Sequence, residues 1–144
     1  MSVAIIGAGV MGAGIAQVAA SKGYQVKLSD RSQDILDKAY SDLSASLQAR
    51  VAKGKISRQD MLSLLGNIEL VVDINELADC SLAIEVIIED IEIKQSLFKQ
   101  LESILATDAI IATNTSSFSI SALARTLEHP SDLSACTFLT QRRF

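Results

Sequence analysis

Three glycines near the start of the chain have a spacing that suits phosphate binding. Gly7, Gly9 and Gly12 follow the apolar run Val-Ala-Ile-Ile (3–6) and open an amphipathic helical pattern. In a dinucleotide-binding unit the first glycine makes the tight turn, the second lets the backbone approach a pyrophosphate, and the third lets the helix pack on the sheet. The helix N-terminus then offers N–H groups to the phosphates. With a strand and a helix pattern flanking them, the glycines predict a dinucleotide-binding turn.

A carboxylate follows at the end of the next predicted strand, 26–29. Asp30 stands about 20 residues beyond the glycines, where a carboxylate can accept hydrogen bonds from the ribose hydroxyls of NAD and repel a 2′-phosphate. Three alternatives stay open: Asp30 caps a helix, Asp30 is a solvated residue at the end of a strand, or Arg31 holds the 2′-phosphate of NADP. We expect the ribose role, with NAD as the cofactor.

Short apolar runs alternate with helical patterns along the chain. This alternation predicts an α/β, Rossmann-type doubly wound parallel sheet. Helices are expected from Met11 to about Gly23, over 90–105, and from an N-cap at Ser119 to Leu127. Strands are expected at 3–6, 26–29, 68–72, 82–87 and 109–113, with a weaker one at 134–139.

Residues 31–67 exceed what one crossover helix requires. They predict a long helix to about Lys53, a break at Gly54, and a second helix near 57–65. The segment is either a tolerated insertion or an arm that reaches a substrate, and periodicity alone favours the insertion.

Composition bounds the remaining possibilities. The 144 residues fit one domain, 1–144, and a net charge of −4 argues against nucleic-acid and anionic-membrane partners. No apolar run is long enough to span a bilayer, and no basic leader opens the chain. Cys80 and Cys136 match no metal spacing and are expected as buried thiols. We expect a cytoplasmic protein without a metal site.

Three segments together resemble the L-3-hydroxyacyl-CoA dehydrogenase family, in its N-terminal NAD-binding domain. They are Gly-Ala-Gly-Val-Met-Gly-Ala-Gly-Ile-Ala-Gln (7–17), Ile-Glu-Asp-Ile-Glu-Ile-Lys (88–94) and Ala-Thr-Asn-Thr-Ser-Ser (112–117). The last two are more discriminating than the glycine turn, and the resemblance runs from Val3 to about Ala135. It implies NAD-dependent oxidation of 3-hydroxyacyl-CoA to 3-oxoacyl-CoA, in fatty-acid metabolism such as β-oxidation.

The resemblance also implies site residues. Glu89 and Lys94 would lie near the nicotinamide; Asn114 and Ser116 would face the reacting carbon, with Ser116 also touching the cofactor. The alternatives are an exposed carboxylate, an exposed lysine and a turn-capping serine. Ser46 and Lys53 would contact CoA, with Lys55 nearby, which makes 31–67 a CoA-facing arm. The implied cofactor contacts are Gly7, Ala8, Gly9, Val10, Met11, Gly12, Asp30, Glu89, Lys94 and Ser116.

One feature departs from the family. A histidine serves there as general base, and Thr137 stands at its position. His129, beside Pro130, is expected to be a bystander. The family's orienting glutamate and its helical C-terminal domain are absent from these residues, and the tail suggests a truncated or frame-shifted product.

Two functions therefore compete. The first is the cofactor domain of a 3-hydroxyacyl-CoA dehydrogenase, inactive by itself; the second is a non-catalytic NAD-binding module. Another dehydrogenase class would share the glycines but would not account for the other two segments. Helices that lack a partner domain are expected to expose apolar surface and to favour a homo-oligomer.

Overall fold

The alternation of strands and helices is confirmed. A computed structural model describes residues 2–115, 118–125, 127 and 133–135. The elements are β1 (Ser2–Ile6), α1 (Val10–Ser21), β2 (Gln25–Ser29), α2 (Gln33–Ala52), α3 (Arg58–Gly66), β3 (Ile68–Val71), the 3₁₀ turn η1 (Ile74–Leu77), β4 (Leu82–Glu85), α4 (Ile91–Ile104), β5 (Ile110–Thr113), α5 (Ile120–Ala124) and β6 (Leu133–Ala135).

The strands form one parallel sheet in the order β3-β2-β1-β4-β5-β6. The chain builds outward from β1 to β3 and then returns to the other side of β1 to continue with β4. The strand order therefore reverses between β1 and β4. In open parallel sheets the crevice beyond the carboxyl ends of the strands at such a reversal is where ligands bind.

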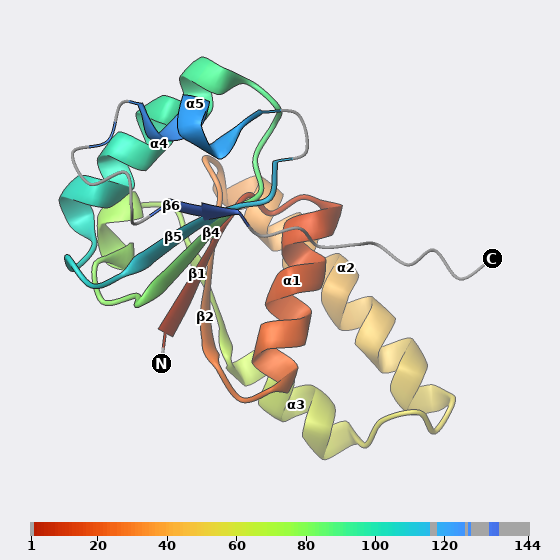
Figure 1. Cartoon of the computed structure of the whole chain (residues 1–144). Helices are drawn as coiled ribbons and strands as arrows, with labels where there is room; N and C mark the ends of the chain where they lie inside the picture. The colour runs from red at the N-terminus through yellow and green to blue at the C-terminus, as the bar shows by residue number, and fades with distance from the viewer. Residues whose placement is uncertain (1, 116–117, 126, 128–132, 136–144) are drawn as a thin grey trace.

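Helices cover both faces of the sheet (Figure 1), with α1, α2 and α3 on one side and α4 and α5 on the other. The residues of β1 alternate between the two cores: Val3 and Ile5 belong to one, and Ala4 and Ile6 to the other. A strand buried on both faces reads as a continuous apolar run, which is why 3–6 contains no polar residue.

The segment 31–67 is an integral part of the first core. Leu36, Leu43 and Leu47 of α2 and Met61 and Leu64 of α3 are buried there with residues of α1. The break falls where the sequence predicts it, since Gly54 has a φ of +66°. A capping box then starts α3: the Ser57 hydroxyl accepts the Asp60 N–H, and the Asp60 carboxylate accepts the Ser57 N–H.

Some expected boundaries differ. The strand predicted over 82–87 ends at Glu85, because the Glu85 side chain accepts the N–H of Ile87 and the chain turns there. The turn η1 was not expected from the sequence. Ser119 caps α5 as predicted, but the helix ends at Ala124, before Leu127. Residues 136–139 of the expected sixth strand lie outside the described residues.

Candidate cofactor-binding site

The turn between β1 and α1 requires glycine at two positions. Gly7 has a φ of +111°, and a Cβ there would lie 2.5 Å from the carbonyl oxygen of Val86. A Cβ on Gly12 would lie 1.8 Å from the carbonyl oxygen of Gly7. The first glycine therefore makes the turn and the third lets α1 approach it, as the spacing predicts.

Gly9 differs because its surroundings are open. It is the N-cap of α1, no side-chain hydrogen bond caps the helix, and a Cβ on Gly9 would meet no atom within 4 Å. The amides of the first turn of a helix have no acceptor within the helix. The N-terminus of α1 thus presents N–H groups beside free space, as a phosphate requires. Val10 is almost fully exposed here, while Ala8 is buried and Met11 packs against the core.

Asp30 directly follows β2 and is tied to the glycine turn. Its Oδ2 accepts the Ala8 N–H at 2.8 Å, and its Oδ1 accepts the Arg31 N–H at 2.8 Å. The N-cap of α2 is Ser32, so the helix-cap alternative for Asp30 is wrong. Each carboxylate oxygen has a second lone pair, so Asp30 can still accept hydrogen bonds from a diol.

A cavity of about 990 Å³ joins these groups. Gly7, Gly9, Asp30 and Arg31 line one part of it. Most of the rest is apolar and comes from α2, from the end of β3 and the turn η1 that follows it, from the loop after β4 and from α4: Ile35, Val72, Ile74, Val86, Ile87, Ile88, Ile93 and Leu97. Its volume lies at the upper end of the range for small-molecule sites.

The sequence analysis missed these apolar residues as site residues. A signal was present, because Val-Ile-Ile (86–88) directly follows a strand at the binding edge. Ile88 is 66% exposed and Val72 is 45% exposed. Large apolar side chains left open to solvent around a cavity indicate that a ligand covers them.

Lys94 is completely buried, so the exposed-lysine alternative is wrong. Its ammonium pairs with Glu85 Oε1 at 2.6 Å, and Glu85 Oε2 accepts the hydroxyl of Thr113 at 2.6 Å. Glu85 and Thr113 are likewise buried, and neither was singled out from the sequence. An acidic residue at the end of an otherwise apolar strand was the signal for Glu85.

Glu89 and Asn114 lie next to this cluster. Glu89 is exposed and accepts a hydrogen bond from Thr115 Oγ1 at 2.8 Å. The N–H of Asn114 donates to the carbonyl oxygen of Glu85 at 2.9 Å. The predicted residues Glu89, Lys94 and Asn114 therefore meet at the carboxyl ends of β4 and β5. Ser116, Thr137 and His129 lie outside the described residues.

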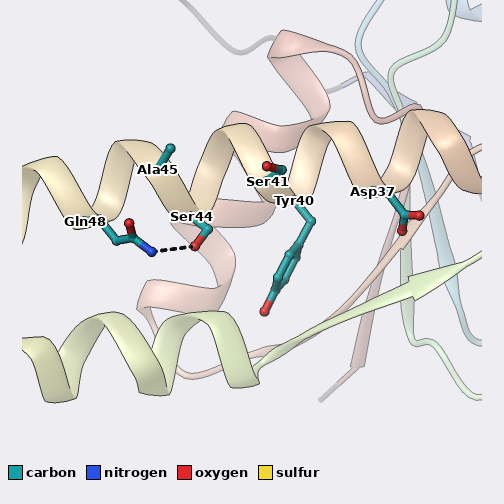
Figure 2. A pocket seen from close by; sticks show the side chains of 6 residues that line it. All are labelled: Asp37, Tyr40, Ser41, Ser44, Ala45 and Gln48. Carbon is teal, nitrogen blue, oxygen red and sulfur yellow. Dashed lines mark hydrogen bonds between the residues drawn. The ribbon is translucent and has the colours of Figure 1, made fainter.

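The predicted CoA contacts lie elsewhere. Ser46 and Lys53 are exposed on α2 and at its C-cap, and neither lines the large cavity. A second cavity of about 420 Å³ follows another flank of α2, with Tyr40 and Ser44 in its lining (Figure 2). Tyr40 points from α2 toward α3, where its hydroxyl lies 3.5 Å from the carbonyl oxygen of Leu65. Ser46 does not line this cavity either.

Comparison with known proteins decides the family. The model of the 3-hydroxyacyl-CoA dehydrogenase NAD-binding domain matches residues 2–141. The chain belongs to this family. Its site fits the cofactor that the family name states, because Gly9 leaves room at the uncapped N-terminus of α1 and Asp30 faces the same cavity.

Individual relatives agree with this assignment. The chain is 41% identical over 137 residues to 3-hydroxyadipyl-CoA dehydrogenase of Escherichia coli, covering 95% of this chain and 29% of that protein. It is 40% identical to a probable 3-hydroxybutyryl-CoA dehydrogenase of Deinococcus radiodurans, covering 96% of this chain and 50% of that one. The crystal structure of 3-hydroxybutyryl-CoA dehydrogenase from Escherichia coli K12 superposes with a TM-score of 0.95 at 40% identity, covering 97% of this chain and 30% of that one. The chain thus spans half or less of these relatives.

Neither a metal centre nor a membrane span is found in the described part of the chain. It holds no group of three His, Cys, Asp or Glu side chains that could bind a metal ion. None of its helices is long and apolar enough to cross a bilayer.

Proposed function

We propose that this NAD-binding domain prefers NAD to NADP and supplies the cofactor half of a 3-hydroxyacyl-CoA dehydrogenase. The observation that carries the proposal is the Asp30 carboxylate, held by the Ala8 N–H in the turn where α1 presents its free N-terminus. A carboxylate there accepts ribose hydroxyls and repels a 2′-phosphate. Arg31 lines the same cavity, but it cannot remove the charge of Asp30.

Calorimetric titration with NADH and NADPH tests the preference. The unaltered chain should bind NADH more tightly. Asp30→Asn should weaken NADH binding about tenfold, because this is the contribution of about one hydrogen bond to a charged group. It should also reduce the difference between the affinities for NADH and NADPH. Asp37→Asn, an exposed carboxylate of α2, is the matched control. Tighter binding of NADPH by the unaltered chain would overturn the ribose role of Asp30.

The proposed substrate is a 3-hydroxyacyl-CoA. Bound NAD supplies the hydride acceptor. Among the chain's own residues, Glu89 borders the nicotinamide. Asn114 and Ser116 face the reacting carbon, and Ser116 donates a hydrogen bond to the 3-oxygen of the substrate. The placement of Asn114 after β5 supports this assignment, because ligands sit at the carboxyl ends of such strands.

A non-catalytic NAD-binding module is the second candidate, and Thr137 favours it. A threonine hydroxyl does not titrate near neutral pH, and loss of a general base costs about 10²–10⁴ in rate. We expect NADH binding but negligible reduction of acetoacetyl-CoA by these 144 residues. A rate near that of an intact dehydrogenase would show that another group replaces the histidine and would exclude the module.

Ser46 and Lys53 are proposed to contact CoA. Both are exposed on the arm formed by α2 and α3, and Lys53 stands at the C-cap of α2. Lys53→Ala should weaken CoA binding measured by calorimetry, whereas Lys38→Ala on the same helix should not. Lys38 suits the control because it is exposed and already paired with Asp42 at 2.7 Å. Equal effects of the two changes would contradict the assignment.

We also propose a cytoplasmic location and self-association. Cys80 supports the location, since it is a buried free thiol and disulfides are rare in reducing compartments. Val18 supports self-association, being 62% exposed on α1.

A further inference from the structure

A cluster of buried polar side chains lies at the carboxyl ends of β4 and β5. Glu85, Lys94 and Thr113 come from β4, α4 and β5, and each is 0% exposed. Burying two charges costs more than packing apolar side chains of the same size, so an ion pair here is weak evidence for stability. The groups that the cluster holds in place give a clearer indication of its role.

Glu85 is the centre of the cluster. Its Oε1 accepts the Lys94 ammonium at 2.6 Å and the Ile87 N–H at 2.7 Å. Its Oε2 accepts the Thr113 hydroxyl at 2.6 Å, and its main-chain carbonyl accepts the Asn114 N–H at 2.9 Å. One residue thereby connects the loop after β4, the helix α4 and the end of β5.

The partners of Glu85 lead to the residues assigned to the nicotinamide half of the proposed site. Ile87 itself lines the large cavity together with Gly7 and Asp30, but the loop that Glu85 holds through the Ile87 N–H continues to Glu89, and Thr113 precedes Asn114. Asp30 places the adenosine ribose beyond β2, so a dinucleotide that crosses the edge of the sheet puts its nicotinamide half over β4 and β5. No hydrogen bond of the Glu85 side chain described here reaches the glycine turn or Asp30.

We infer that Glu85 is a positioning residue for the nicotinamide half of the cofactor site. It fixes the loop that carries Glu89, holds the Lys94 charge in one place, and sets the end of β5 from which Asn114 projects. This inference rests on the proposed function. A merely structural role would weaken both halves of the site together or neither, whereas positioning acts on the nicotinamide half alone.

NADH and ADP-ribose separate these cases, because ADP-ribose lacks only the nicotinamide. Thr113→Val removes the hydroxyl that Oε2 accepts while keeping the shape of the side chain, and Thr113→Ser keeps the hydroxyl. We expect Thr113→Val to weaken NADH binding, because Glu85 then no longer holds the end of β5 in place, and to leave ADP-ribose binding unchanged. Thr113→Ser should restore NADH binding, and Glu85→Gln should act in the same direction as Thr113→Val.

Lys27→Met is the control for loss of an ion pair elsewhere in the sheet, since Lys27 pairs with Asp79 at 2.7 Å. It should change neither affinity. Circular dichroism checks that each variant is folded. Equal losses for NADH and ADP-ribose, or unchanged NADH binding in folded Thr113→Val, would overturn the inference. An unaltered chain that binds neither ligand would instead overturn the proposed function and the inference with it.

Discussion

Gly12→Ala tests the closest contact in the glycine turn. The new Cβ would lie 1.8 Å from the carbonyl oxygen of Gly7, whereas ordinary contact begins near 3.4 Å, so α1 must move by about 1.6 Å (3.4 − 1.8). The carbonyl oxygen of Gly7 belongs to the backbone and cannot rotate away. The destabilisation therefore lies near the upper end of the range for overpacked sites, about 3 kcal/mol. Alanine returns about 1 kcal/mol through its helix propensity. The net loss is about 2 kcal/mol, which lowers Tm by roughly 5–10 °C.

Thermal unfolding followed by circular dichroism measures this loss. Gly14→Ala is a matched control in the same helix, because its Cβ would meet nothing within 4 Å. That variant should gain up to about 1 kcal/mol and unfold at a higher temperature. If Gly12→Ala proved as stable as Gly14→Ala, the close approach of α1 to the turn would be refuted.

Three further substitutions test the pyrophosphate space, the cap of α3 and the exposed face of α1. Gly9→Ala should keep nearly the stability of the unaltered chain, since the new Cβ would meet no atom within 4 Å. It should weaken NADH binding at least tenfold in calorimetry, because the methyl group occupies the space for the pyrophosphate. An unchanged NADH affinity would contradict this placement of the pyrophosphate. Ser57→Ala should lower Tm at neutral pH, because the variant loses the hydroxyl that accepts the Asp60 N–H and donates to the Asp60 carboxylate. The bond to the carboxylate holds the Asp60 pKa below its ordinary 3.8, so this part of the loss is present above that pH and disappears as pH falls through the folded pKa. The difference in Tm should therefore be smaller in acid than at neutral pH, and a difference that grew on acidification would contradict this account. Val18→Lys should reduce self-association in light scattering, because this side chain is 62% exposed; a strictly monomeric unaltered chain would refute the expectation.

Local pattern was sufficient for most of the fold. Apolar runs marked the strands, and Gly54 marked the break within 31–67, because a tight turn depends on the residue that forms it. Element ends were less certain. The end of β4 at Glu85 depends on a hydrogen bond from the side chain to Ile87 that no periodicity reveals.

Some residues of the candidate cofactor site were predictable from the sequence, and others were not. The roles of Gly7 and Gly12 in the turn were predictable, because backbone geometry sets them. Asp30 was recognisable as a candidate, because it is a charge at a strand end. The apolar lining was not, because Ile74 and Leu97 come from separate elements and meet only across the cavity. The burial of Lys94 was also beyond the sequence, since a lysine on a helix is exposed unless another element supplies its partner.

The sequence by itself determined which candidate site residues occur and in what order along the chain. They are a glycine turn, an acidic residue at a strand end, and polar residues after the fourth and fifth strands. These depend on residue type and local spacing, so they can be read without coordinates. The tertiary structure decided which of them meet. It joined Glu85, Lys94 and Thr113 into one buried cluster, because parallel strands bring residues that are distant in sequence to a common edge of the sheet. A buried charge such as that of Lys94 is stable there only when an oppositely charged group such as Glu85 pairs with it.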